Sequence, residues 1–126
     1  MSGFAFDANI VIDAMAGYPL ARSEIERAVG LSSRPWISRM AWIEVLSKGS
    51  EGVVREAMEF MSHFGLDEID EEISRRAAAL RRERPRLKSP DAIILATAQI
   101  RGRVLITRNT KDFPSEMPGI RVPYVL

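Results

Sequence analysis

The chain contains 126 residues, of which 46% are hydrophobic, and this length and composition fit one folded domain and exclude a disordered chain. Its 18 basic and 17 acidic side chains almost balance, giving a net charge of +1. Cysteine is absent, which excludes disulfide bonds, thiolate metal ligands and cysteine nucleophiles.

No apolar run reaches the roughly 18 residues of a membrane span, and the first residues lack the pattern of a secretory signal. Together with the missing cysteine, this predicts a cytoplasmic protein without membrane contact. Because His63 is the single histidine, a zinc site of the usual His and Cys type is not expected. Any bound metal should have oxygen ligands, which points to Mg²⁺ or Mn²⁺.

The spacing of apolar residues predicts short strands that alternate with helices. Strands are expected at about residues 3–6, 36–37, 66–69, 104–107 and 120–122. Helices are expected at about residues 8–16, 20–29, 39–48, 52–63, 70–84 and 90–101. Gly30 is expected to end the second helix, and Ser89 to be the N-cap of the last. Such alternation implies a mainly parallel sheet covered on both faces, so we predict one three-layer α/β/α domain over residues 1–126.

Two of these helices carry further patterns. In the helix over 52–63, apolar residues recur at helical spacing, which is typical of a core face or a subunit interface. The large side chains that support an interface are Met58, Phe60, Met61 and Phe64. In the helix over 70–84, acidic residues precede arginines by four positions, a spacing that favours ion pairs. The expected pairs are Glu71–Arg75 and Glu72–Arg76.

Carboxylates stand at three positions where a predicted strand ends or a helix begins. Asp7 follows the first strand, Glu44 lies in the helix after the second strand, and Asp91 opens the most apolar helix. Each also has an ordinary structural interpretation. Asp7 fits a helix N-cap, and Asp91 fits a first-turn acid that complements the helix dipole. Glu44 is spaced to pair with Lys48 on the surface.

Asn109 and Asp112 lie in the loop that follows the strand over 104–107. Turn chemistry alone would explain both residue types. However, ligands of open α/β sheets bind in the crevice at the carboxyl ends of the strands, where all of these side chains are expected. Because clustered carboxylates repel one another unless a cation neutralises them, the sites together favour a metal centre at this edge.

Four segments of the chain, taken together, carry a family resemblance. They are residues 6–12 (FDANIVI), Glu44, residues 89–98 (SPDAIILATA) and residues 105–113 (LITRNTKDF). In this order they make nearly the whole chain resemble a PIN domain, and specifically the VapC-type toxins of toxin–antitoxin pairs. The resemblance implies a ribonuclease that depends on Mg²⁺ or Mn²⁺, a VapB-type antitoxin as partner and a homodimer.

The same resemblance assigns roles to the polar residues. It implies that Asp7, Glu44 and Asp91 are catalytic and bind the metal. The fourth acidic position of the family falls on Asn109, with Asp112 three residues further on, so both are candidates to complete the catalytic site. One or two cations are compatible with this set. Two further side chains are expected to support the metal ligands, namely Asn9 and Thr107.

A basic segment precedes Asp91. Between Arg75 and Lys88 there are seven basic residues and one acidic residue, Glu83. A local basic patch attracts phosphates even on a nearly neutral protein. We therefore expect RNA-binding cations here and in the loop around Asn109; they are Arg81, Arg82, Arg86, Lys88, Arg108 and Lys111. The alternatives are a solvated helix face and a surface for an acidic antitoxin tail.

Other functions are compatible with parts of the pattern. A haloacid-dehalogenase-like phosphotransferase would need a second Asp where this chain has Asn9. A receiver domain would need an acidic pair and a phosphorylated Asp, for which Asp67 is the nearest candidate. A PIN-fold module that binds or regulates without cleaving RNA is favoured only by Asn109.

Overall fold

The protein is described by a computed structural model that covers residues 3–32, 34–114 and 116–126. Strands and helices alternate along this part of the chain. In order they are β1 (Phe4–Phe6), α1 (Ala8–Met15), α2 (Pro19–Ser32), β2 (Pro35–Ser38), α3 (Arg39–Val45), α4 (Glu51–Met61), β3 (Gly65–Asp67), α5 (Glu71–Glu83), α6 (Ser89–Arg101), β4 (Val104–Ile106) and β5 (Ile120–Arg121). Within these ranges, no helix combines the length and apolarity needed to cross a membrane.

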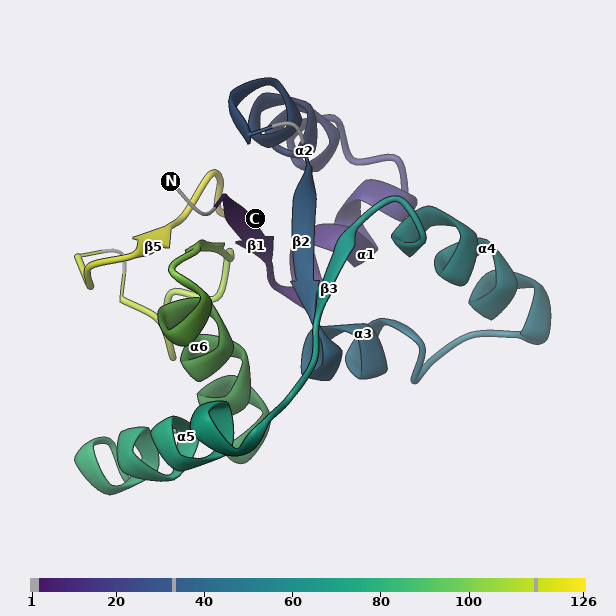
Figure 1. The fold of residues 1–126 in the computed structure, drawn as a ribbon. Helices are drawn as coiled ribbons and strands as arrows, with labels where there is room; N and C mark the ends of the chain where they lie inside the picture. Colours follow the sequence, from purple (N-terminus) through teal and green to yellow (C-terminus); the bar gives the residue numbers. More distant parts are fainter. Residues whose placement is uncertain (1–2, 33, 115) are drawn as a thin grey trace.

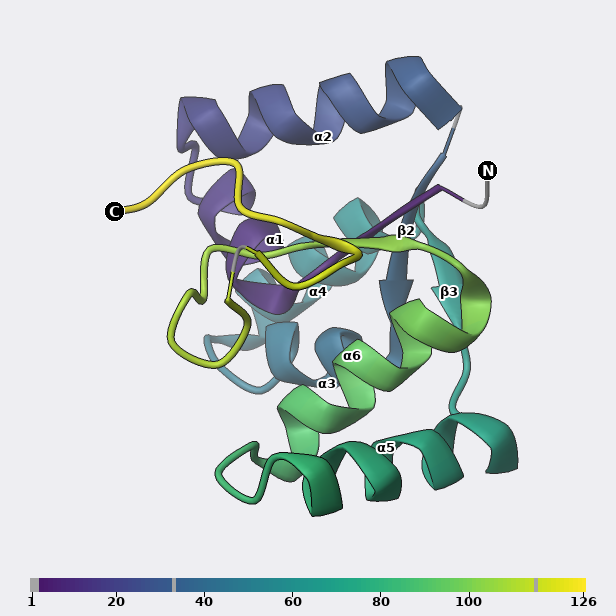
Figure 2. The same ribbon diagram turned by 90° about the vertical axis from the view of Figure 1, so that its left-hand side faces the viewer.

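The strands form one parallel sheet in the order β3-β2-β1-β4-β5. β1 lies at its centre, where Ala5 is opposite Trp36 of β2 and Leu105 of β4. Figure 1 shows α5 and α6 on one side of the sheet and α1 and α4 on the other. The turned view in Figure 2 shows α6 between the sheet and α5. The predicted three-layer α/β/α fold with a parallel sheet is therefore confirmed.

Continuous apolar runs explain why the central elements are buried on both faces. Every residue of β1 is buried, as expected for a central strand of a parallel sheet. Six of the 13 residues of α6 are buried as well, because this helix is covered by the sheet and by α5. On the opposite side, Ile10 and Val11 of α1 are completely buried. Phe6 and Phe64 pack edge to face with ring centroids 6.0 Å apart, which ties β1 to the segment after α4.

Gly65 allows β3 to lie close to β2. A Cβ atom at this position would lie 2.4 Å from the ring of Trp36, so a larger residue would force the two strands apart. The guanidinium of Arg103 lies 3.6 Å from the centre of the same ring and donates to both oxygens of Asp67 at 2.7 and 2.9 Å. Asp67 is therefore a buried partner of Arg103, which argues against a receiver domain with a phosphorylated aspartate here.

Two predicted helix ends are wrong. α2 continues through Gly30 to Ser32, because the cost of about 1 kcal/mol for a glycine inside a helix does not by itself end it. The hydroxyl of Ser32 then donates to the carbonyl of Ala28 at 2.9 Å. α3 ends at Val45, three residues earlier than expected, and Leu46 is its C-cap.

The predicted N-cap of α6 is also wrong. Lys88, not Ser89, is the N-cap, and it makes no side-chain capping bond. Pro90 fits within the first turn because the amides there have no partner inside the helix. Asp91 is consequently the third helical residue and still an acid of the first turn.

The apolar stripe of α4 belongs mostly to the core. Met61 and Phe64 are buried, whereas Met58 is 49% exposed. The interface expected on this helix therefore has less apolar surface to offer than the sequence suggested.

One of the two ion pairs expected in α5 is present. Glu71 and Arg75 lie 2.7 Å apart. Arg76 is bound elsewhere, because its Nε donates to Gln99 of α6 at 2.7 Å and its Nη1 lies 3.4 Å from Glu83. The expected Glu72–Arg76 pair is thus replaced by a hydrogen bond that joins α5 to α6 and an ion pair within α5.

Candidate metal centre

Predicted site residues line a common cleft at the carboxyl edge of the sheet, with a volume of about 580 Å³. They come from four separate parts of the chain: the start of α1, α3, the first turn of α6 and the loop after β4. The residues that share the cleft are Asp7, Asn9, Glu44, Asp91, Arg108 and Asn109. Parallel strands explain the convergence, because their carboxyl ends meet at one edge.

Asp7 caps α1 and also lines the cleft. Its Oδ1 accepts a hydrogen bond from the amide of Ala8 at 2.7 Å. The residue is only 4% exposed. Burial raises the pKa of Asp7, and hydrogen bonds from Thr107 and Ala8 oppose this rise without cancelling it. A nearby cation would favour the charged form of such a carboxyl.

Thr107 and Asn9 orient the carboxylate of Asp7. The buried hydroxyl of Thr107 donates to Oδ2 of Asp7 at 2.8 Å, and the side-chain amide of Asn9 donates to the same atom at 3.2 Å. The side-chain oxygens of Asn9 and Thr107 accept bonds in turn from the backbone amides of Arg108, at 3.4 Å, and Asn109, at 3.0 Å. These contacts join the end of β1 to the loop after β4 and fit the supporting role expected of the pair.

Glu44 and Asp91 are close enough to Asp7 for the charges to interact. Burial, followed by the charges of Asp7 and Asp91, raises the pKa of Glu44. Burial, followed by the charges of Asp112 and Asp7, raises the pKa of Asp91 to about 6. Shifts of this kind arise when a carboxyl is both desolvated and close to other carboxylates. The three acids thus form one electrostatic unit.

Asn109 and Asp112 bind each other within their loop. The amide group of Asn109 donates to Oδ2 of Asp112 at 3.0 Å, and the backbone amide of Asp112 donates to Oδ1 of Asn109 at 3.3 Å. Asn109 lines the cleft, whereas Asp112 lies close enough to Asp91 for its charge to contribute to the raised pKa of Asp91. Of the two candidates for the fourth position, Asn109 therefore lines the cleft and Asp112 acts on one of its carboxyls.

The donor set fits a divalent cation held by oxygen. Carboxylate oxygens are the ligands that Mg²⁺ and Mn²⁺ prefer. A cation would favour the charged forms of three carboxyls whose pKa values are raised by burial, and would relieve the repulsion that adds to the rise at Glu44 and Asp91. In the described part of the chain, no three acidic or histidine side chains already form a compact metal-binding group. Repulsion between like charges keeps carboxylates from gathering closely unless a cation is present. The residues that would hold the ion are Asp7, Glu44 and Asp91.

One of the predicted RNA-binding cations lines this cleft, and a second acts on one of its carboxyls. Arg108 lines it, and the charge of Arg108 opposes the rise in the pKa of Asp7. Lys88 precedes α6 and acts on Asp91 in the same direction. Both positive charges therefore act on carboxyls of the cleft.

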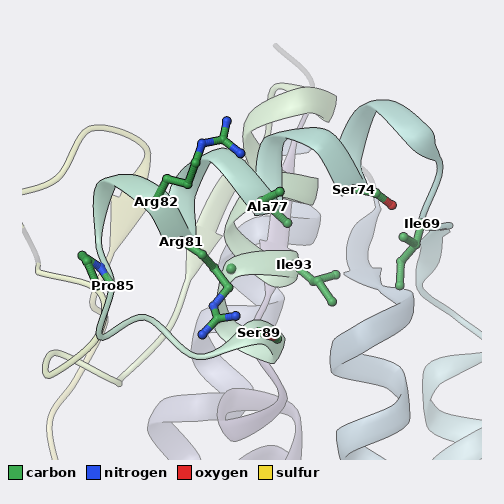
Figure 3. Close-up of a pocket in the computed structure, with 10 residues that line it drawn as sticks. Ile69, Ser74, Ala77, Arg81, Arg82, Pro85, Ser89 and Ile93 are labelled. Carbon is green, nitrogen blue, oxygen red and sulfur yellow. The ribbon is translucent and has the colours of Figure 1, made fainter.

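The other predicted cations lie further away. Arg81 and Arg82 line a separate groove between α5 and α6, with a volume of about 680 Å³. Figure 3 shows Arg81 pointing toward Ser89 at the start of α6 and Arg82 pointing away from it. Nε of Arg81 donates to the carbonyl of Leu87 at 3.0 Å, so this arginine also holds the connector between the two helices. Two further cations are exposed and line neither hollow, namely Arg86 and Lys111.

Sequence reasoning missed Asp13 and Tyr124. Nε and Nη2 of Arg108 donate to the two oxygens of Asp13 at 2.6 and 3.2 Å, and the hydroxyl of Tyr124 donates to Oδ2 of Asp13 at 2.7 Å. Asp13 follows Asn9 by four positions on α1, and that spacing places both on one helix face. Nothing in the sequence connects Tyr124 to a residue 111 positions earlier.

Comparison with known families identifies the fold of the chain. Residues 4–115 match the family model of the PIN domain, and the chain therefore belongs to the PIN domain family. No curated protein sequence gives a significant match.

Solved structures share the fold over nearly the whole chain. A chain of a toxin–antitoxin complex from Klebsiella pneumoniae is 39% identical with a TM-score of 0.87, over 97% of this chain and 98% of that chain. A chain of DNA-bound VapBC from Salmonella typhimurium is 24% identical with a TM-score of 0.76, over 96% of both chains. A chain of VapBC2 from Rickettsia felis, bound to a fragment of its promoter, is 18% identical with a TM-score of 0.76, over 93% of this chain and 94% of that chain. The resemblance to VapC-type PIN domains is confirmed.

Proposed function

We propose that this protein is the toxin of a VapBC-type toxin–antitoxin pair and acts as a metal-dependent endoribonuclease. The observation that carries the proposal is the convergence of Asp7, Glu44 and Asp91 on one cleft, where the pKa of each carboxyl is raised. Membership of the PIN domain family, whose members are in general nucleases, supports the reaction class. The 39% identity to a chain of a toxin–antitoxin complex supports the biological role.

The side chains of the site have different proposed roles in the reaction. Asp7, Glu44 and Asp91 would hold Mg²⁺ or Mn²⁺. The bound cation would make a water molecule acidic enough to lose a proton and attack a phosphodiester, and it would stabilise the negative charge that develops. Thr107 and Asn9 keep the carboxylate of Asp7 oriented through bonds of 2.8 and 3.2 Å.

RNA has to approach a cleft that is itself acidic, so cations at its rim are needed to hold the backbone. Arg108 and Lys88 are the predicted cations nearest to the carboxylates. We propose that the RNA backbone passes these two residues and continues along the basic groove between α5 and α6. That groove is lined by Arg81 and Arg82.

The proposed partners are a VapB-type antitoxin and a second copy of this chain. The likeness to a chain of a toxin–antitoxin complex supports the antitoxin, and the resemblance to VapC-type toxins suggests the second copy. The exposed Met58 of α4 remains as apolar surface for the homodimer, whereas Met61 and Phe64 are occupied in the core. Light scattering of the purified protein at micromolar concentration tests the dimer, and a monomer there would count against it.

The test of the reaction is incubation of the purified protein with total RNA. Cleavage is expected with Mg²⁺ or Mn²⁺ and none with a chelator. Sequencing of RNA ends after brief induction in cells should then reveal recurrent cut sites. A protein that binds RNA but produces no new ends with either ion would instead support a PIN-fold module that regulates without cleaving, the alternative suggested by Asn109.

A further inference from the structure

Arg108 is held at the rim of the cleft by an ion pair with Asp13. Its Nε and Nη2 donate to the two oxygens of Asp13 at 2.6 and 3.2 Å. The side chain of Asp13 is 12% exposed and that of Arg108 is 31% exposed, so the acid is shielded while the guanidinium still reaches the cleft. A guanidinium carries five N–H donors. This pair uses two, and among the described residues no hydrogen-bond acceptor is found for the rest.

Tyr124 is a second hydrogen-bond donor to Asp13. Its hydroxyl donates at 2.7 Å to Oδ2 of Asp13, the oxygen that also accepts from Nε of Arg108. The ring of Tyr124 packs against that of Tyr18 with centroids 5.0 Å apart. Burial opposes ionisation of Asp13, but the bonds from Arg108 and Tyr124 outweigh it, so the pKa of Asp13 lies below its ordinary value. Asp13 is therefore charged at neutral pH. Its carboxylate links Tyr124 to Arg108 through hydrogen bonds.

The segment that carries Tyr124 is itself anchored. Arg121 of β5 donates to both oxygens of Glu24 in α2 at 2.6 and 3.0 Å. Glu24 is 5% exposed, and a second arginine, Arg27, donates to it at 2.8 Å. The two bonds from Arg121 form a bidentate, charge-assisted contact that orients β5 against α2. Tyr124 lies only three residues after Arg121, so the anchored strand limits where its side chain can lie relative to Asp13.

We propose that Asp13 and Tyr124 are positioning residues for Arg108, and that Arg108 binds an RNA phosphate with its remaining donors. This inference rests on the proposed ribonuclease function. A bidentate pair fixes the plane of the guanidinium and hence the direction of its free N–H groups. A side chain that is already ordered loses less conformational entropy when the phosphate binds. If Asp13 instead competed with RNA for Arg108, loosening the pair would strengthen binding.

The test measures RNA affinity by fluorescence anisotropy. The probe is a short labelled single-stranded RNA of random sequence, with Ca²⁺ in place of Mg²⁺ to keep it intact. Arg108→Ala should raise the Kd about tenfold, the effect of losing a hydrogen-bonded charge. Tyr124→Phe keeps the ring and removes only the hydroxyl, and it should raise the Kd about threefold. Tyr18→Phe removes the hydroxyl of the other ring and should leave the Kd unchanged.

A double-mutant cycle separates positioning from a general structural effect. In the Arg108→Ala background, Tyr124→Phe should have no further effect. Asp13→Asn should weaken binding even though it makes the protein more positive. The inference is overturned if Tyr124→Phe leaves the Kd unchanged, if its effect persists without Arg108, or if Asp13→Asn strengthens binding. Protein that follows the expected pattern but cuts no RNA with Mg²⁺ would contradict the proposed function alone.

Discussion

The hydroxyl of Thr107 donates a hydrogen bond of 2.8 Å to Oδ2 of Asp7. This bond joins the ends of the neighbouring strands β4 and β1, and Thr107 is completely buried. It stabilises the charged form of a carboxyl whose pKa is raised by burial. In a metal site, Thr107 would keep Asp7 ready to act as a ligand without touching the ion.

Replacement of Thr107 by Val tests this relationship, because Val has nearly the same shape and no donor. We expect the metal-free variant to lose about 2 kcal/mol of unfolding free energy, the cost of leaving a buried charged group short of a partner. Metal affinity should fall as well, because the pKa of Asp7 would rise further. Urea denaturation with a chelator measures the first effect and calorimetry the second. Thr110→Val, at an exposed position of the same loop, is the matched control, and an equal loss there would contradict a specific role for Thr107.

Asp91 should make the metal-free protein less stable at neutral pH. Its pKa is raised from 3.8 to about 6, first by burial and then by Asp112 and Asp7. The folded protein therefore binds more protons than the unfolded chain between these values, and stability falls as pH rises through that window. Above about pH 6 the full cost of the charge is present, and Asp91→Asn removes it.

We expect Asp91→Asn to stabilise the metal-free protein at pH 7.5 by about 1 kcal/mol after solvent screening, which raises the Tm by about 4 °C. The difference should vanish below the ordinary pKa of 3.8. Mg²⁺ should raise the Tm of the wild type only. Thermal melts across pH, with and without Mg²⁺, measure all three. Equal protection of the variant by Mg²⁺ would remove Asp91 from the metal site; the exposed Glu26→Gln is the control.

The proposed path of the RNA backbone past Lys88 and along the groove lined by Arg82 predicts that RNA affinity depends on salt through these two cations. Arg82→Ala combined with Lys88→Ala should weaken RNA binding and reduce the slope of log K against log salt by about two, because each lost phosphate contact lowers it by roughly one. Lys88 makes no side-chain capping bond, so the fold should remain intact. The control removes two exposed cations from other helices, Arg22 of α2 and Arg55 of α4. An equal change of slope in both double variants would show that only net charge matters.

The sequence predicted the parts of this molecule that depend on local patterns. Apolar runs such as Phe4–Phe6 identified the buried strands, and the parallel sheet that they imply brought Asp7 and Asp91 to one edge. Helix ends were predicted less well, since Gly30 is tolerated inside α2 and Lys88 rather than Ser89 caps α6. In both cases the energy differences between neighbouring end points are small.

Contacts between residues far apart in the chain could not be predicted. The bond from Tyr124 to Asp13 depends on where β5 places its following segment, and the Asp67–Arg103 pair depends on the close approach that Gly65 allows. The contact of Arg76 with Gln99 likewise replaced a favourable local pairing with Glu72. Spacing along the chain indicates which side-chain pairs are possible, whereas the packing of helices and strands determines which of these pairs form.

Measuring RNA cleavage by Asp7→Asn protein tests whether the carboxylate of Asp7 is needed for metal-dependent cleavage. Asn is as good an N-cap as Asp, so this change keeps the cap of α1 and removes the charge that a cation requires. We predict that cleavage of total RNA with Mg²⁺ or Mn²⁺ is lost, while circular dichroism stays that of the wild type and Glu26→Gln protein cleaves normally. Cleavage at the wild-type rate by Asp7→Asn protein would show that Asp7 is only a helix cap, and would contradict the metal-dependent mechanism at this cleft.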